Sequence, residues 1–236
     1  MIDWADQRVL ILSPHPDDEV IGCGGLISKV KDAGGQVFVQ FVTLGDTRDI
    51  SVKGMSTADE RVAEIESVAG VLKYDEWDIA LRGPQYHLRL DAMAQVDLIA
   101  VLEQRARLSL RAVEPTVVLL PSPVSYNQDH RAVAEATLTA LRPMGTDGHT
   151  APVVVALFEQ VADQWTPLSD PAPNLFVELE QLHLDAKIEA MRAYGSQVRP
   201  HPHTRSLEAL EAMAAVRGAH SGVAYAEAFR CVRWMA

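Results

Sequence analysis

The chain has 236 residues, of which 48% are hydrophobic, and its formal net charge is −11 at pH 7. This length suits one large α/β domain or two small ones, and the apolar content is enough to fill a core. Nucleic acid is not an expected partner, because binding a duplex needs a basic surface and the chain has no Lys/Arg-rich run.

The N-terminal segment and the cysteines indicate the compartment. Residues 1–8 contain neither the basic nor the apolar region of a signal peptide. No apolar run approaches the roughly 18 residues that a membrane span needs. The two cysteines, Cys23 and Cys231, are too few for a disulfide framework or for a four-thiolate zinc site. These features predict a cytoplasmic protein without a membrane span.

Apolar runs of strand length alternate with longer helical patterns along the chain. In chain order, the pattern predicts a strand at 8–13, a helix at 19–35, a strand at 36–43, helices at 57–72 and 91–113, a strand at 116–121, a helix at 128–143, strands at 152–159 and 174–179, and helices at 179–195 and 206–218. Such alternation is typical of a mostly parallel sheet with helices on both faces. We therefore expect an α/β fold, and a single domain over residues 1–236.

The polar cluster HPDDE, residues 15–19, directly follows the first predicted strand. Helix capping is one interpretation, since acidic residues suit the first turn of a helix. Capping accounts for one carboxylate better than for three, and it does not account for His15. A phosphate-binding turn is a second interpretation, but the glycines at 22, 24 and 25 do not follow the G-x-G-x-x-G spacing. We expect these glycines to let the helix lie close to the sheet.

A metal site is the third interpretation, and it uses every residue of the cluster. A hydrolytic metal centre needs about three protein ligands and an open position. His15 and Asp18 have suitable chemistry, which leaves Asp17 free to act as a general base, because a bound metal brings the pKa of water toward about 7. This interpretation predicts that Asp17 faces the water rather than the ion.

The segment NQDHRAVAEA, residues 127–136, follows another predicted buried strand and opens a helix. The carboxyl ends of parallel strands share one rim, so His130 is a candidate third ligand. Asp129 beside it is a candidate hydrogen-bond partner for a ligand. The alternative is that Asn127 or Asp129 caps the helix and His130 lies on the surface. Of the other histidines, we expect His183 to be structural and those at 87, 149 and 220 to be exposed.

These motifs resemble the LmbE-like, or PIG-L, family of zinc-dependent N-deacetylases. HPDDEVIGCGG resembles the family's first motif, which is specific, and NQDHRAVAEA resembles the second. Supporting segments are VTLGD (42–46), RVAEIESVAGVL (61–72), KIEAMRAYGSQ (187–197) and RGAHSGVAYAEAF (217–229). The resemblance covers nearly the whole chain. It implies a Rossmann-like three-layer fold and hydrolysis of an N-acetyl group, usually on an N-acetylglucosamine-type sugar or glycoconjugate.

Carried over to this chain, the resemblance implies a zinc ion bound by His15, Asp18 and His130, with Asp17 as general base. Asp129 would orient a ligand. Iron(II) also suits two histidines and one carboxylate. The expected partner is a small N-acetylated sugar, and a homo-oligomer is compatible with such an enzyme.

One position departs from the family pattern. Several members carry a histidine three residues before the metal histidine, where this chain has Asn127. Asparagine can donate a hydrogen bond to an oxyanion but cannot act as a general acid. His203, in a segment that resembles an H-P-R-S segment of some relatives, is a candidate to serve the leaving group. His201 is the alternative in the same segment, and Asp17 could instead return the proton.

The segment that follows the second predicted strand supplies candidate substrate contacts. Arg48 and Asp49 are candidate substrate-binding residues, with loop charges as the alternative. Two other functions stay open, namely an amidase acting on a larger acyl or thiol conjugate and a non-catalytic metal-binding relative.

Overall fold

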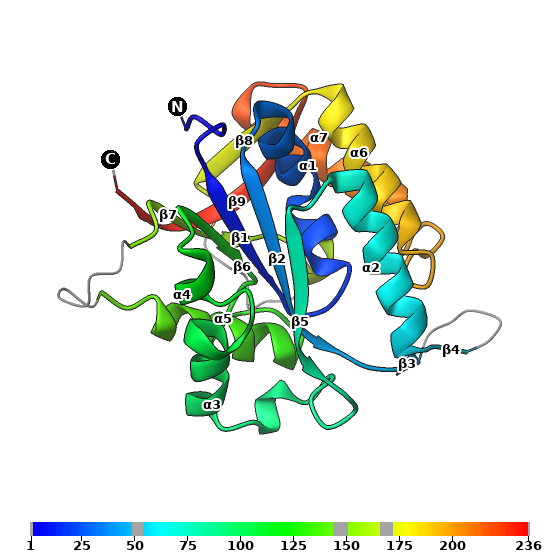
Figure 1. The fold of residues 1–236 in the computed structure, drawn as a ribbon. Helices are drawn as coiled ribbons and strands as arrows, with labels where there is room; N and C mark the ends of the chain where they lie inside the picture. The colour runs from blue at the N-terminus through cyan, green and yellow to red at the C-terminus, as the bar shows by residue number, and fades with distance from the viewer. Residues whose placement is uncertain (1, 49–53, 144–150, 166–171, 236) are drawn as a thin grey trace.

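The computed structural model describes residues 2–48, 54–143, 151–165 and 172–235. A seven-stranded sheet forms the centre of the molecule (Figure 1). Its strands, in spatial order, are β5 (Glu76–Arg82), β2 (Gln36–Leu44), β1 (Arg8–Ser13), β6 (Val117–Leu120), β7 (Val154–Phe158), β9 (Tyr225–Trp234) and β8 (Leu175–Leu179). The first five are parallel, and β9 runs antiparallel to both of its neighbours. The prediction of an α/β fold with a mostly parallel sheet is confirmed.

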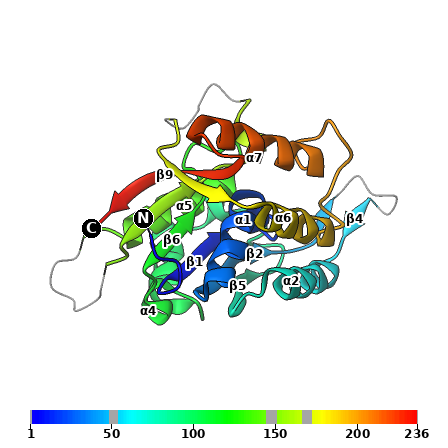
Figure 2. The ribbon, with the colours of Figure 1, turned by 90° about the horizontal axis from the view of Figure 1, so that it is seen from above.

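Helices cover both faces of the sheet, as the alternating pattern predicts. One core lies beneath α1 (Asp18–Ala33), α2 (Ala58–Leu72), α6 (Gln181–Ala193) and α7 (Leu207–Ser221). The other lies beneath α3 (Gln95–Ala100), α4 (Leu110–Val113) and α5 (Gln128–Ala140). Helix α6 packs against both α1 and α2 (Figure 2). Among the described residues, no helix has the length and apolar character to cross a membrane.

The predicted helix at 91–113 is wrong, because the structure divides it. It contains the 3₁₀ turn η1 (Leu90–Ala92), α3, the π-helical turn η2 (Val101–Arg105) and α4. The backbone becomes extended at Ala106, and Ser109 starts α4 by accepting a hydrogen bond from the Ala112 N–H. Between them, the Leu108 N–H donates to the buried Gln40 side chain of β2 at 3.1 Å. A partner that lies 68 residues away therefore decides where the helix stops.

Two strands of the main sheet are absent from the prediction. Strand β5 lies at one edge, and Ile79 is its only buried residue, so it lacks a continuous apolar run. Strand β9 pairs with β8 through residues 225–229 and with β7 through residues 229–234, and it carries Glu227 among its apolar residues. The hairpin of β3 (Thr47–Arg48) and β4 (Met55–Ser56) is too short to give a pattern.

Helix α1 lies unusually close to its neighbours, as expected from its glycines. A Cβ atom at Gly22 would lie 2.5 Å from the Phe158 ring, and one at Gly25 would lie 2.4 Å from Leu179. Contacts this short would push the helix away from the sheet. The expectation that these glycines permit close packing is confirmed.

A buried ion pair fastens α1 to α6 and β9. Lys187 Nζ lies 2.6 Å from Glu227 Oε1, and both side chains are about 95% buried. The Glu227 carboxylate also accepts from the Gly25 and Leu26 N–H groups at 2.9 and 2.7 Å. Lys187 donates in addition to the Ile21 carbonyl at 2.8 Å. Each charge is therefore surrounded by hydrogen-bond partners, as a buried pair requires.

Removing one member of this pair is expected to destabilise the protein strongly. Lys187→Met leaves the Glu227 carboxylate buried without its counter-charge, which costs about 3–5 kcal/mol of unfolding free energy. The measurement is chemical denaturation with a constant m-value. Lys29→Met is the control, because Lys29 is partly exposed, takes no part in this ion pair and donates to the Glu178 carbonyl. Equal stabilities of the two variants would contradict the role of the pair.

Candidate metal centre

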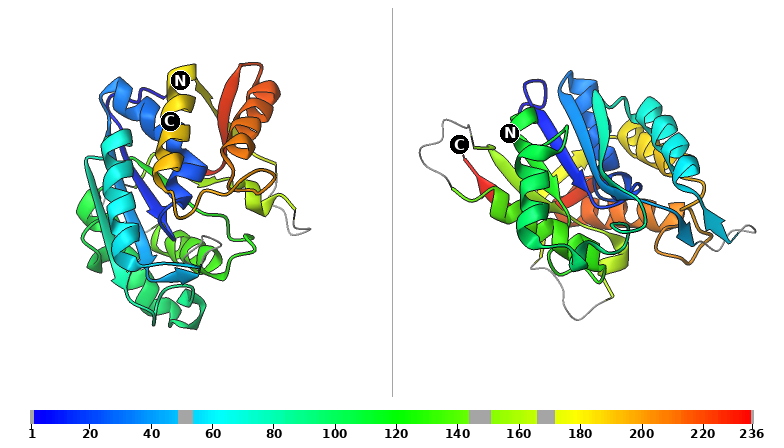
Figure 3. Two further views of the ribbon diagram at one scale, coloured as in Figure 1. Left: turned by 90° about the vertical axis from the view of Figure 1, so that its right-hand side faces the viewer. Right: turned by 60° about the horizontal axis from the view of Figure 1, so that its bottom comes forward.

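The topology of the sheet brings two distant turns together. From β1 the chain proceeds outward to β2 and β5, then returns to pair β6 on the other side of β1. Loops that follow β1 and β6 therefore diverge and leave a crevice at their carboxyl ends, where open α/β sheets bind ligands. HPDDE follows β1, and the start of α5 follows β6. The segment between α6 and α7 lies at this same edge (Figure 3).

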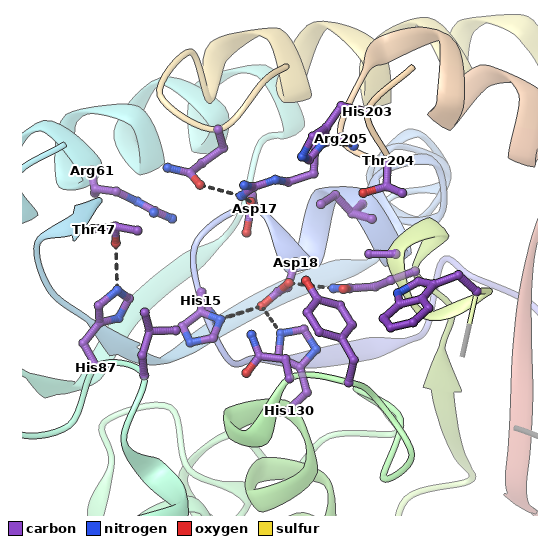
Figure 4. A pocket seen from close by; sticks show the side chains of 18 residues that line it. His15, Asp17, Asp18, Thr47, Arg61, His87, His130, His203, Thr204 and Arg205 are labelled. Atoms are coloured by element: carbon purple, nitrogen blue, oxygen red, sulfur yellow. Dashed lines mark hydrogen bonds and ion pairs between the residues drawn. The ribbon is translucent and has the colours of Figure 1, made fainter. Parts of the chain in front are cut away.

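Three side chains converge in the crevice (Figure 4). Asp18 Oδ2 lies 3.4 Å from His15 Nδ1 and 3.1 Å from His130 Nε2, and all three residues are buried. Atoms bound at about 2.0–2.1 Å to one tetrahedral ion lie about 3.3–3.4 Å from one another. The donor set, two imidazole nitrogens and one carboxylate oxygen, is also one that zinc accepts. The residues therefore fit a single divalent cation.

Neighbouring side chains orient this cluster. Asp129 Oδ2 accepts from His15 Nε2 at 2.9 Å, and the other Asp129 oxygen accepts from the Leu90 N–H at 2.9 Å. This contact turns His15 Nδ1 toward Asp18. Gln160 Nε2 donates to the second oxygen of Asp18 at 2.6 Å. These two contacts occupy His15 Nε2 and Asp18 Oδ1, so His15 Nδ1 and Asp18 Oδ2 are the atoms that face the centre of the cluster. Supporting residues orient the ligands of metal sites in the same way.

Opposite charges in the cluster stabilise one another. Burial opposes the charged form of His15, but the hydrogen bonds that its ring donates to the Asp129 and Asp18 carboxylates outweigh burial and raise the pKa of His15 to about 9. Burial likewise favours neutral Asp18, but His130 and His15 hold its pKa well below the usual range. The cluster is thus built to hold positive charge next to an ionised Asp18.

Asp17 lies beside the three-residue cluster without belonging to it. Its backbone has a φ of 114°, which is uncommon for a residue with a side chain, and its side chain makes no helix-capping hydrogen bond. Arg205 Nη1 lies 3.4 Å from Asp17 Oδ2. Burial and the charge of Asp18 raise the pKa of Asp17, and Arg205 and Arg61 partly offset them. Asp17 is therefore a more basic carboxylate than one in water.

Glu19 supports the strained turn at Asp17. Its Oε2 atom accepts from the Asp17 N–H at 3.1 Å, and its Oε1 atom accepts from the hydroxyls of Tyr194 and Tyr74 at 2.6 and 3.0 Å. Burial raises the pKa of Glu19 to about 7. The carboxylates of HPDDE thus have separate contacts, and capping alone does not describe them.

Asn127 has a structural contact and a free end. It is the N-cap of α5, and its Oδ1 atom accepts from the Asp129 N–H at 2.9 Å. That contact assigns Nδ2 as the donor end of the amide. Asn127 lines the same cavity as His15 and Asp17, so the amide can donate a hydrogen bond to a ligand there.

His203 also lines the cavity, from the segment between α6 and α7. Its Nδ1 atom accepts from the Arg205 N–H at 3.0 Å, so the ring proton lies on Nε2. Burial, Arg205 and Arg199 lower the pKa of His203. The geometry therefore favours a neutral hydrogen-bond donor over a protonated acid.

The candidate substrate residue on β3, Arg48, does not line the cavity. Arg48 is exposed and is not among the residues that line it, whereas its neighbour Thr47 is. Asp49 lies outside the described residues. Thr47 Oγ1 lies 2.7 Å from His87 Nε2, and the His87 ring packs edge-on against His15 with centroids 5.3 Å apart. The expectation that His87 is exposed is wrong: it is buried, and burial together with His15 lowers its pKa to about 4.

Several polar residues that line the cavity were not predicted as site residues, among them His87, Gln160 and Arg205. Gln160 and His87 follow the carboxyl ends of β7 and β5, so the same rim rule that selects His130 could have found them. Arg61 lies in α2 and donates to the Pro16 carbonyl, a contact without a local sequence signal.

The chain is similar in sequence to one protein family and to characterised proteins. The PIG-L model, described as GlcNAc-PI de-N-acetylase, matches residues 10–141. The chain is 28% identical to diacetylchitobiose deacetylase of Thermococcus kodakarensis, over 96% of this chain and 83% of that protein. It is 27% identical to 1D-myo-inositol 2-acetamido-2-deoxy-alpha-D-glucopyranoside deacetylase 1 of Saccharopolyspora erythraea, over 83% and 79%.

A solved structure extends the similarity to three dimensions. It is N,N'-diacetylchitobiose deacetylase from Pyrococcus horikoshii complexed with its inhibitor MPG, with a TM-score of 0.70 and 26% identity. The match covers 98% of this chain and 85% of that one. All three of these relatives are deacetylases by name, and the Pyrococcus structure shares its fold with the chain described here.

Proposed function

The chain belongs to the PIG-L family, and from this premise we propose that it is a metal-dependent hydrolase that removes the acetyl group from an N-acetylglucosamine-type sugar or glycoconjugate. One observation carries the proposal. Asp17 is a buried carboxylate of raised pKa that lines the same cavity as the three metal-type donors and is not one of them. A protein that only bound a metal would have no need for a free base at that position.

We propose that His15, Asp18 and His130 hold one zinc ion per chain, with iron(II) as an alternative suited to the same donors. Such an ion, when bound, polarises the acetyl carbonyl and makes water acidic enough for a carboxylate base. Asp129 and Gln160 keep His15 and Asp18 turned toward it.

The remaining steps fall to the chain's own side chains. Asp17 takes a proton from the attacking water, and Arg205 at 3.4 Å favours the ionised form of the carboxylate, which partly offsets the effect of burial. Asn127 Nδ2 and His203 Nε2–H donate hydrogen bonds to the developing oxyanion or the leaving nitrogen. Because the pKa of His203 is lowered, we assign the return of the proton to Asp17. The C–N bond breaks, and acetate and a free amine result.

The proposal predicts acetate release from N-acetylglucosamine-type sugars by protein loaded with zinc. The measurement is a screen of N-acetyl sugars against conjugates that carry larger acyl or thiol groups. Chelation is expected to abolish turnover, and added zinc to restore it, because water is not acidic enough for Asp17 without the ion. If the protein hydrolyses only the larger conjugates, the amidase alternative replaces the proposed deacetylase function. Full activity of the chelated, metal-free protein would refute the mechanism.

A further inference from the structure

The mouth of the site cavity has an apolar wall that the proposed chemistry does not use. Trp165 is 73% exposed, Tyr126 is 53% exposed and Leu88 is 42% exposed, and all three line the cavity. Single exposed apolar side chains are ordinary, but several around one concave site mark a binding surface. The reacting groups at the cavity floor are polar, so this wall must contact a different part of a ligand.

The two aromatic side chains stand on loops that are fastened together. Tyr126 precedes α5 in the loop after β6, and Trp165 follows the 3₁₀ turn η3 (Val161–Asp163) after β7. Strands β6 and β7 are adjacent and parallel, so these loops leave the same edge side by side. Asp163 Oδ1 accepts from the Ser125 hydroxyl at 2.8 Å and from the Tyr126 N–H at 3.2 Å. Specific hydrogen bonds therefore fix the two loops that carry Tyr126 and Trp165 relative to each other.

Leu88 completes the wall at an energetic cost. Its backbone has a φ of 57°, the left-handed region that an apolar side chain seldom adopts. Gln128, in the first turn of α5, donates to the Leu88 carbonyl at 3.0 Å and holds this conformation. Such strain is typically kept where it positions a group for a ligand.

The size of the cavity indicates what reaches the wall. Its volume is about 350 Å³, near the lower end of the roughly 300–1,000 Å³ of ligand sites. One acetamido sugar at the floor leaves the next group of the substrate at the mouth. Resting on the proposed function, we propose that Trp165 and Tyr126 form a subsite for a second pyranose ring, so that the preferred substrate is a disaccharide or longer.

The chemistry of a pyranose ring suits this subsite. Its flat face presents C–H groups, which are attracted to the electron-rich face of an aromatic ring, while its edge presents hydroxyls. The Tyr126 hydroxyl offers a hydrogen bond beside that face. A second ring therefore gains both contacts, whereas N-acetylglucosamine alone gains neither.

The test compares substrates that differ only in the second group. Zinc-loaded protein is assayed for acetate release from N-acetylglucosamine, N,N'-diacetylchitobiose and octyl N-acetylglucosaminide. Trp165→Ala is expected to lower the ratio of kcat/KM for the disaccharide over the monosaccharide about tenfold, since aromatic contacts are worth up to about 1.5 kcal/mol. Trp165→Phe should restore most of the ratio. Trp234→Ala, an exposed tryptophan on β9 outside the cavity, should leave it unchanged.

Three results would overturn the subsite: a ratio unchanged in Trp165→Ala, no recovery in Trp165→Phe, or an equal loss on the octyl glycoside, which would indicate an alkyl contact. Calorimetric binding of both sugars to Asp17→Asn protein separates this proposal from the proposed function. If the wild type hydrolyses neither sugar, the function fails, yet tighter disaccharide binding that depends on Trp165 would still support the subsite. Binding without that dependence would refute it.

Discussion

Asp17→Asn is expected to lower the rate of acetate release about 10³-fold while the metal stays bound. The substitution keeps the size of the side chain but removes its ability to accept a proton. Asparagine tolerates a positive φ about as well as aspartate, so the turn at φ 114° should survive. The Asp17 N–H contact with Glu19 is made by the backbone and should also survive. The change therefore isolates proton transfer from the architecture of the site.

The measurement is kcat together with the zinc content of the same preparation. Asp185→Asn is the matched control, because Asp185 is an exposed carboxylate on α6 whose contact is with Gln181. It should retain both activity and metal. If Asp17→Asn kept a rate near that of the wild type with metal in place, Asp17 would be excluded as the base.

His130→Ala is expected to abolish both metal binding and turnover. His130 lies at the start of α5 and is one of only three donors in the cluster. Removing a residue that only orients a metal ligand lowers the metal affinity about 10–100-fold. Removing one of the ligands themselves should lower it further. After dialysis, the variant is expected to hold little zinc and to release no acetate above background.

Thermal unfolding makes this test independent of activity. Zinc that binds the folded chain raises the Tm by an amount that grows with the logarithm of the zinc concentration divided by Kd. Added zinc should therefore stabilise the wild type and leave His130→Ala unaffected. His220→Ala, at an exposed position of α7, should respond as the wild type does. Stoichiometric zinc in folded His130→Ala protein would show that the three-residue cluster is not the metal site.

The residues of the HPDDE motif could be predicted as a site because the features that indicate it lie within a few residues of one another. HPDDE follows an apolar run that can only be a buried strand, and Asp17 and Asp18 have different neighbours because adjacent residues in a turn point differently. His130 was reachable by one further rule, that parallel strands share a carboxyl edge. Each of these steps needed only periodicity, turn chemistry and sheet geometry.

Other features depend on partners far along the chain. Asp129 holds His15 across 114 positions, and that contact exists only because β6 pairs directly with β1. The break near Ala106 follows from Gln40, whose side chain takes a backbone N–H that a continuous helix would have used. The residues next to His15 give no sign of Asp129, and the residues next to Ala106 give no sign of Gln40.

By itself, the sequence determined the fold class, the three metal-type donors that converge (His15, Asp18 and His130) and the close packing of α1, because hydrophobic period, turn chemistry and side-chain volume act within a few residues. Only the tertiary structure decided that Gln160 and Arg205 join the site, that His87 is buried there, and that Tyr126 and Trp165 stand together at its mouth. The reason is physical. Local patterns specify which face of an element is buried, whereas strand order and loop contacts decide which buried or exposed faces meet.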